Sequence, residues 1–243
     1  MIYAILMIAL LLTVISAVRA WTIALRAVPA YRRLQETVGA AVESGRSVHV
    51  SLGSSALLDE SALTAVAGAE LLYQAAARAS GGDLPVTAST TDPVTLRLAH
   101  DRLQRAYRLR NRLDAFKPTL ARWYPSGTFS LALAAGVGAA LLDEESGLAL
   151  LCGRFGAELA LIADTAIRYD RDLLPHSTQI EGQAVAYATS ATPLLGEELF
   201  VGAAYLEPTP LHIGGVAAQD ALRYLVVIAL IALAVLAFLG VSL

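Results

Sequence analysis

The chain has 243 residues, of which 18 are basic and 21 acidic, so its net charge is −3, and 56% of its residues are hydrophobic. The single cysteine, Cys152, excludes an internal disulfide framework, and the four histidines have no spacing typical of a structural zinc site. The acidic balance and the lack of a recognised binding motif argue against a nucleic-acid partner.

Both ends of the chain are uncharged. All charged residues lie between Arg19 and Arg223, which leaves apolar segments at 1–18 and 224–243. An α-helix needs about 20 apolar residues to cross a bilayer, so we predict a transmembrane helix in each segment. A cleaved signal peptide is the alternative for 1–18. The basic residues follow this apolar run instead of preceding it, which favours a retained anchor.

Residues 19–46 are predicted to form a juxtamembrane helix that continues from the first span, with a kink permitted at Pro29. The positive-inside rule places the basic residues of this segment on the inner side of the membrane. The residues concerned are Arg19, Arg26, Arg32 and Arg33. This predicts a two-pass protein of the bacterial inner (cell) membrane, with both termini outside and a cytoplasmic domain. A periplasmic domain is the alternative.

Residues 47–207 are predicted to form one α/β domain, because short apolar runs alternate with longer segments of helical period. In the clearest unit, a strand at Ser47–Ser51 is followed by an Ala-rich helix at Asp59–Ser80. Asp92 and Pro93 are typical of the N-cap and first position of a helix, which we expect to end near Asn111.

Six strands are predicted in this domain, at 47–51, 84–88, 128–133, 148–152, 173–175 and 194–195. The helices between and after them are predicted at 59–80, 93–111, 134–145, 157–169, 181–190 and 197–205. This order favours a Rossmann-like, mostly parallel sheet with flanking helices. Residues 208–223, which contain prolines and a Gly-Gly pair, are predicted to be a linker to the second transmembrane helix.

Four short motifs in this order carry a resemblance to a known family. They are VHVSLG at Val48–Gly53, TTDP at Thr90–Pro93, GRFG at Gly153–Gly156 and GEELF at Gly196–Phe200. Set between two apolar ends, they resemble an uncharacterised family of bacterial membrane-anchored proteins with a domain of unknown function, seen mostly in Chloroflexota-type bacteria. The resemblance covers nearly the whole chain. It implies a Rossmann-like domain between two terminal membrane helices and brings no established activity.

Ligands of open parallel sheets bind beyond the carboxyl ends of the strands, and polar residues follow several predicted strands. Backbone amides at Gly53, Ser54 and Ser55 could hold a phosphate, and Arg154 could pair with an anion. The full candidate ligand set is Gly53, Ser54, Ser55, Thr91, Asp92, Arg154 and Glu197. In the alternative interpretation, Gly and Ser only make tight turns, and Asp92 and Glu197 cap helices. Because neither a G-x-G-x-x-G motif nor a P-loop is present, we predict no cofactor.

The chemistry of an enzyme is not favoured by the sequence. Ser54 or Ser55 with His176 and Asp164 would supply a nucleophile, a base and an acid, but no G-x-S-x-G motif raises a serine into an exposed turn. Cys152 lies in an apolar run and is expected to be a buried thiol. We therefore predict a protein with neither a catalytic site nor a metal site.

The charges are segregated along the chain. Residues 97–122 hold eight basic side chains and two acidic ones, whereas residues 143–220 hold twelve acidic and three basic ones. Within the first segment, Arg97, Arg105, Arg108 and Arg112 recur at helical spacing and therefore share one helix face. This face has three interpretations: solvated surface, contact with anionic lipid, or packing against an acidic face of a neighbouring copy.

From this architecture and charge layout we predict a membrane-anchored, oligomerising scaffold or membrane-organising protein without enzymatic activity. Head-to-tail contacts between copies held in one bilayer would close into a ring or continue as an arc. Its expected partners are the lipid bilayer and other copies of itself, with any hetero-subunits unspecified. The alternative is a membrane-tethered sensor that binds a nucleotide or small anion at the strand ends.

Overall fold

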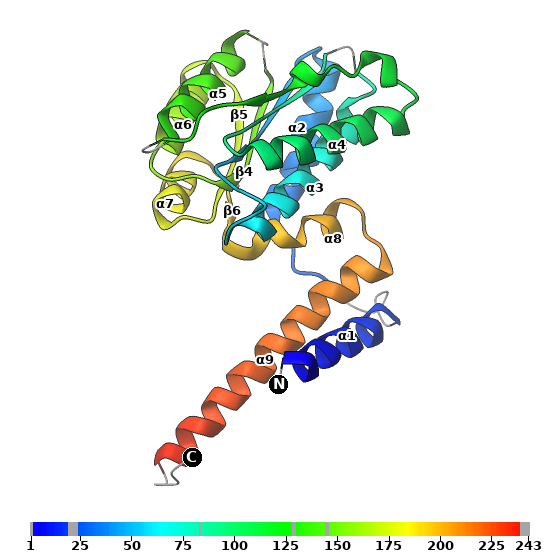
Figure 1. The fold of residues 1–243 in the computed structure, drawn as a ribbon, viewed down its shortest axis with the longest axis vertical. Coiled ribbons are helices and arrows are strands. Elements are labelled where there is room, and N and C mark those ends of the chain that lie inside the picture. Colours follow the sequence, from blue (N-terminus) through cyan, green and yellow to red (C-terminus); the bar gives the residue numbers. More distant parts are fainter. Residues whose placement is uncertain (1, 19–23, 83, 128–129, 144–145, 239–243) are drawn as a thin grey trace. The chain divides into compact units, whose positions relative to one another are not determined.

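The computed structural model describes residues 2–18, 24–82, 84–127, 130–143 and 146–238 (Figure 1). The chain divides into two compact units. Val28–Gly202 forms the first, which we call the α/β unit. Met1–Ala27 and Ala203–Leu243 together form the second, which we call the terminal unit.

The α/β unit contains one six-stranded sheet in which all paired strands are parallel. The strand order is β3-β2-β1-β4-β5-β6, the order of doubly wound, Rossmann-like sheets. The prediction of a Rossmann-like sheet of six strands is therefore confirmed. The strands are β1 (Val48–Gly53), β2 (Val86–Thr90), β3 (Ala121–Trp123), β4 (Leu148–Arg154), β5 (Asp172–Ser177) and β6 (Leu194–Leu195).

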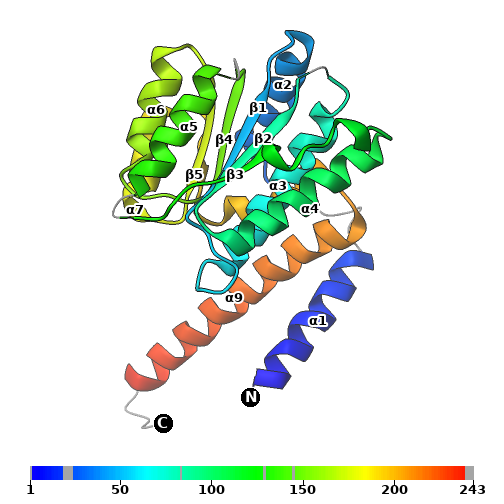
Figure 2. The same ribbon diagram turned by 45° about the horizontal axis from the view of Figure 1, so that its top comes forward.

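Helices cover both faces of this sheet, as Figure 2 shows. One layer consists of α2 (Pro29–Glu43), α3 (Ala62–Ala79) and α4 (Pro93–Leu109). The other consists of α5 (Leu131–Asp143), α6 (Leu159–Arg168) and α7 (Ile180–Thr189). Within the described part of the unit, 3₁₀ turns lie at Leu113–Ala115, Pro118–Leu120 and Gly196–Val201, and the last of these leads into the short helix α8 (Gly202–Leu206).

The two faces of the central strands meet different layers. Gly68 of α3 lies against Leu52 of β1 and Cys152 of β4, so these two positions face α3. Because side chains alternate along a strand, the neighbouring positions face the opposite layer of helices. On that other face, Ala149 and Leu151 of β4 share a core cluster with the buried residues of α5 and α6. His49 and Ser51 of β1 pair in register with Ala149 and Leu151 and therefore lie on the α5 face.

Local chemistry explains where several elements begin. The Asp92 carboxylate accepts a hydrogen bond from the Thr95 backbone N–H at 2.6 Å, and Pro93 occupies the first position of α4, so this helix start is as predicted. β4 is buried along its length until Arg154. A strand buried on both faces is typical of the centre of a parallel sheet.

The predicted third strand is wrong. Leu131–Leu133, expected to end a strand at 128–133, forms the first turn of α5, while residues 128 and 129 lie outside the described residues. The third strand is instead β3, within the stretch expected to be irregular. An apolar run is equally compatible with a buried helix, and a three-residue strand is too short to show an alternating pattern.

Two expectations for the connections also differ from the structure. Residues 24–28 are not helical and α2 begins at Pro29, so proline starts a helix here instead of kinking one; residues 19–23 of the expected juxtamembrane helix lie outside the described residues. Residues 210–223, predicted as linker, are the first half of a long helix, α9 (Pro210–Phe238).

The terminal unit consists of α1 (Ile2–Val18) and α9 with their connections. A side chain at Gly214 of α9 would lie 2.5 Å from the backbone nitrogen of Ala17, so this glycine lets the two helices approach closely. Among the described residues, α9 is the one helix long and apolar enough to cross a membrane, over Pro210–Val235. The 17 residues of α1 extend only about 26 Å, somewhat less than a ~30 Å hydrocarbon layer.

Candidate functional site

The sheet reverses its winding between β1 and β4, so the carboxyl ends of these two strands mark the place where a ligand of this architecture binds. Two glycines bring the strand ends into contact. A Cβ atom at Gly153 would lie 2.0 Å from the Leu52 carbonyl oxygen, and one at Gly53, whose φ is +61°, would lie 2.4 Å from the Arg154 carbonyl oxygen. The glycines therefore serve close backbone packing at this point.

The two serines predicted to receive a phosphate bind the backbone of β4 instead. The Ser54 hydroxyl donates to the Arg154 carbonyl at 2.9 Å, and the buried Ser55 hydroxyl accepts from the Arg154 N–H at 2.8 Å. The Ser54 N–H also donates to the Arg154 carbonyl. These contacts join the turn after β1 to the end of β4, in agreement with the structural interpretation of Gly53, Ser54 and Ser55.

Arg154 points to acidic groups of its own chain. Its guanidinium lies 3.3 Å from the Glu60 carboxylate and 3.8 Å from that of Asp59. The Ser61 side chain and backbone N–H both donate to Asp59. These hydrogen bonds lower the pKa of the Asp59 carboxyl, and the nearby Arg154 charge acts in the same direction. Any anion that pairs with Arg154 must therefore compete with two carboxylates.

A surface pocket of about 380 Å³ lies beside this arginine. It is bounded by the start of α3, the end of β4 and the turn after β5. Its lining residues are Glu60, Ser61, Thr64, Arg154, Thr178 and Gln179. Arg154 is the one predicted ligand residue among them. The other five were not predicted because none of them directly follows a predicted strand: three lie at the start of α3 and two lie just after β5.

The remaining predicted ligand residues lie elsewhere. The Thr91 backbone carbonyl accepts a hydrogen bond from the Trp123 indole at 2.9 Å, and Asp92 caps α4. Glu197 is exposed in the 3₁₀ turn after β6. None of these three lines the pocket, so the structure does not bring the predicted ligand set together as one site.

Of the candidate nucleophile and base residues, Ser55 and His176 are buried in the fold and Ser54 is half-buried. Burial lowers the pKa of His176, whose Nε2 atom lies 3.1 Å from the Gly196 carbonyl oxygen. Burial also raises the pKa of the Cys152 thiol. Asp164 instead forms an exposed ion pair with Arg168 at 2.9 Å, within α6. Within the described part of the chain, no group of three or more His, Cys, Asp or Glu side chains is arranged to hold a metal ion.

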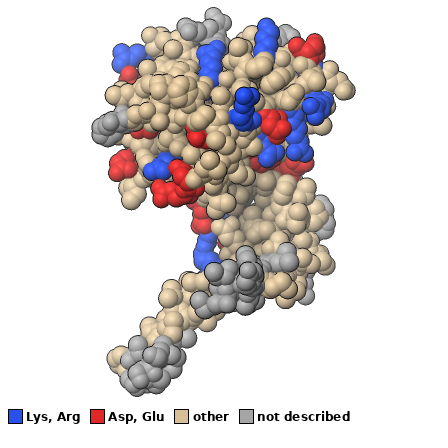
Figure 3. Space-filling model, viewed as in Figure 1, with Lys and Arg blue, Asp and Glu red and all other residues tan. Residues whose placement is uncertain are grey.

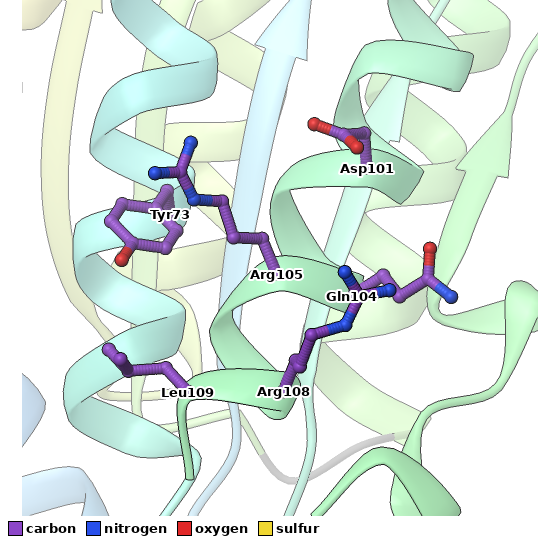
Figure 4. Close-up of a pocket in the computed structure, with 6 residues that line it drawn as sticks. All are labelled: Tyr73, Asp101, Gln104, Arg105, Arg108 and Leu109. Carbon is purple, nitrogen blue, oxygen red and sulfur yellow. The ribbon is translucent and has the colours of Figure 1, made fainter. Parts of the chain in front are cut away.

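The predicted basic face forms one side of a second pocket, of about 440 Å³, between α3 and α4 (Figure 4). Arg105 extends from α4 over the ring of Tyr73 on α3, with its guanidinium carbon 5.4 Å from the ring centroid. Arg108 and Leu109 line the same pocket one turn further on. Tyr73 was missed because cation–π contacts between helices leave no sequence pattern.

The four predicted interface arginines are not equivalent. Arg97, Arg105 and Arg108 are exposed. Arg112 is half-buried and donates to the backbone carbonyls of Ser80 and Gly82, at 3.2 and 2.8 Å. Arg112 therefore anchors the turn between α3 and β2, and the exposed basic face consists of the other three.

Comparisons with known proteins identify a family and no activity. The family model described as a domain of unknown function, DUF6754, matches residues 1–243. No curated protein and no solved structure gives a match. The prediction of a family with a domain of unknown function is thus confirmed, whereas its bacterial group and its membrane anchoring stay predictions. Because the match extends over the whole length, the chain belongs to the DUF6754 family, defined by a domain of unknown function.

Proposed function

We propose that this protein is a membrane-anchored, non-enzymatic scaffold that assembles with copies of itself. The observation that carries the proposal is the exposed basic face of α4. Among the described contacts, Arg97, Arg105 and Arg108 have no ion pair within the α/β unit. Arginines that line an open pocket with an aromatic ring and a leucine are typical of protein interfaces, in which Arg and aromatic residues are enriched.

The anchoring part of the proposal starts from α9, whose described side chains between Tyr224 and Phe238 are mostly large, apolar and exposed. We propose that α1 crosses the bilayer beside α9, as the close packing at Gly214 favours. Arg26, Arg32 and Arg33 would then lie on the inner side. Both termini would lie outside and the α/β unit in the cytoplasm of a bacterial cell.

The association itself is proposed to be electrostatic and head-to-tail. The basic face of one copy would meet acidic side chains of the next, drawn from the acid-rich segment 143–220. Complementary charges of this kind steer association and specify orientation. Because such a contact uses different surfaces on the two copies, it leads to a ring or an arc. Salt should weaken it, since exposed charges are screened over about 10 Å at 0.1 M ionic strength.

The test is the particle mass of the full chain in lipid nanodiscs or detergent, measured by light scattering at low and high salt. The Arg105→Glu/Arg108→Glu variant should lose the large particle that the unaltered chain forms at low salt. The control is Arg46→Glu/Lys117→Glu, which makes the same change in charge at exposed positions on other segments. A monomer at both salt concentrations, or equal loss in the control, would refute the charge-built assembly.

The pocket beside Arg154 favours a second candidate function, that of a membrane-tethered sensor of a small anion or nucleotide. An anion would have to displace Glu60 from Arg154. Isothermal titration with inorganic phosphate and with ATP tests this directly. The Arg154→Ala variant should lose the binding and leave the particle mass unchanged. If the unaltered chain takes up neither ligand, the sensor is ruled out for these two anions.

A further inference from the structure

The outward side of α5 is apolar throughout. From Leu131 to Leu142 the helix has no charged residue and consists of Leu, Ala, Gly and Val. Its exposed positions recur at helical spacing and are Leu131, Ala132, Ala135, Ala139 and Leu142. We call these five residues the α5 stripe. Its two leucines are 54% and 39% exposed, although the opposite side of the helix is already buried against the sheet.

Such a helix is unusual on the outside of an α/β unit. A helix that covers a sheet normally has one apolar side and one polar side, and a helix that is apolar all round is normally buried all round. The inner side of α5 is fully buried, at Leu133, Val137 and Leu141. No described residue of the α/β unit buries the α5 stripe, although its apolar composition is typical of a buried surface.

The neighbouring helix extends the surface. α5 and α6 pack side by side (Figures 1 and 2), and a Cβ atom at Gly138 would lie 3.4 Å from the Thr165 hydroxyl. α6 adds Leu161, which is 53% exposed, and the exposed Asp164–Arg168 ion pair. Figure 3 shows mostly uncharged surface over α5 and α6, whereas basic side chains gather over α4.

We infer that this surface binds the same surface of a second copy, with the two α5 helices antiparallel. The α5 stripe is its own complement under a two-fold axis near its centre. Leu131 of one copy then meets the partner's Leu142, and the small residues Ala135 and Ala139 let the helices approach closely. Asp164 and Arg168 already pair within each copy at 2.9 Å, so this part of the surface carries no net charge and fits a second copy of itself better than a strongly charged partner.

The size of the surface sets its strength. α5 and α6 are about 20 and 15 Å long and each about 10 Å wide, so their combined planar face is roughly 350 Å² per copy. Stable interfaces bury about 800 Å² per partner. The dimer is therefore weak in free solution and gains from confinement in a membrane. In this one respect the inference rests on the proposed anchoring; the geometry of the contact does not.

The test uses the full chain in nanodiscs and places a charge inside the α5 stripe. Ala135→Arg/Ala139→Arg should weaken dimerisation at least about tenfold, measured by the particle mass over a dilution series. Both positions are exposed, so folding should persist, which circular dichroism checks. The matched control is Gln35→Arg/Ala40→Arg, two exposed positions of α2 on the opposite face of the sheet. An unchanged mass in the α5 variant would overturn the inference.

A cross-linking experiment tests the direction of packing and separates this contact from the basic face. Copies with Ala135→Cys and copies with Ala139→Cys should form a disulfide dimer when mixed, and much less when each is oxidised alone. The dimer should persist in the Arg105→Glu/Arg108→Glu background, even if the larger particle is lost. Equal cross-linking of each variant with itself, or none in the mixture, would contradict the antiparallel pair. Cys152 is buried and does not interfere.

Discussion

The two helical layers of the sheet distribute polarity in opposite ways. α4 presents charged side chains to the outside, while β1 presents Val48, Val50 and Leu52 to the layer that contains α3 and α4. On the other face, α5 is apolar on its outside, and β1 presents His49 and Ser51 beneath it. The first face is the ordinary amphipathic arrangement, and the second is close to its inverse.

The buried polar groups beneath α5 are satisfied among themselves. The His49 ring nitrogens lie 2.9 Å from the Thr87 hydroxyl and 3.1 Å from the Ser89 hydroxyl, and Ser89 donates to Ser51 at 2.9 Å. A fully paired network costs little when it is buried. The polar residues beneath α5 therefore do not explain why its outer side is apolar. A binding partner on that outer side would explain it.

The largest expected effect tests whether both layers are packed equally tightly. A Cβ atom at Gly68 of α3 would lie 2.3 Å from the Cys152 carbonyl oxygen, and one at Gly182 of α7 would lie 2.2 Å from the Phe155 carbonyl oxygen. Gly68→Ala and Gly182→Ala should each lower the free energy of unfolding by about 3 kcal/mol or more, because backbone must move. Urea unfolding of the full chain in detergent, followed by circular dichroism, measures both losses.

The control for these variants is a helical glycine with space around it. A Cβ atom at Gly39 of α2 would meet no described atom within 4 Å outside its own helix turn, so Gly39→Ala should stabilise the chain by up to about 1 kcal/mol through helix propensity. If only one of the two close-packed variants proves costly, the layers differ in packing as well as in polarity.

The next effect concerns the polar network beneath α5. Burial, helped by the charge of Arg122, lowers the pKa of His49 from 6.5 to about 3. Protonation then favours the unfolded chain, so the contribution of neutral His49 is complete above pH 6.5 and declines as the pH falls towards 3. The expected loss is about 1.4 kcal/mol per pH unit within this window. Urea unfolding at pH 4 to 7.5 measures this slope.

A His49→Gln variant separates this histidine from others that are buried. Burial also lowers the pKa of His176, so the free energy of unfolding of the variant should still depend on pH. The dependence should be smaller by the contribution of about one proton. If the slope is identical in the two proteins, His49 does not titrate as its burial requires.

The smallest effect lies on the charged face. Asp92→Ala removes the carboxylate that caps α4 at Thr95 and should cost about 1 kcal/mol, whereas Asp92→Asn should restore most of it, since either side chain caps a helix. Thermal unfolding of the three proteins gives the ranking. Equal loss in both variants would mean that the charge of Asp92 matters more than its capping hydrogen bond.

The sequence predicted most of the sheet because short strand-like runs alternate with longer segments of helical period, and because Asp92 and Pro93 mark the start of α4. β1, β2, β4, β5 and β6 and the start of α4 were found in this way. β3 was missed because a strand of three residues is too short to show a period. The start of α5 was mistaken for a strand because a short apolar run is compatible with either a strand or a buried helix. Of the candidate ligand residues, only Arg154 borders the pocket at the strand ends.

The sequence by itself determined the order of strands and helices, the apolar ends and the spacing of the basic residues, because these depend on local periodicity and charge. Only the tertiary structure decided that Ser54 and Ser55 bind β4, that Glu60 pairs with Arg154, and that Arg105 lies over Tyr73. These contacts join residues far apart in the sequence, for which no local pattern exists. Likewise, only the packing of α5 on the sheet decided which of its apolar residues remained exposed.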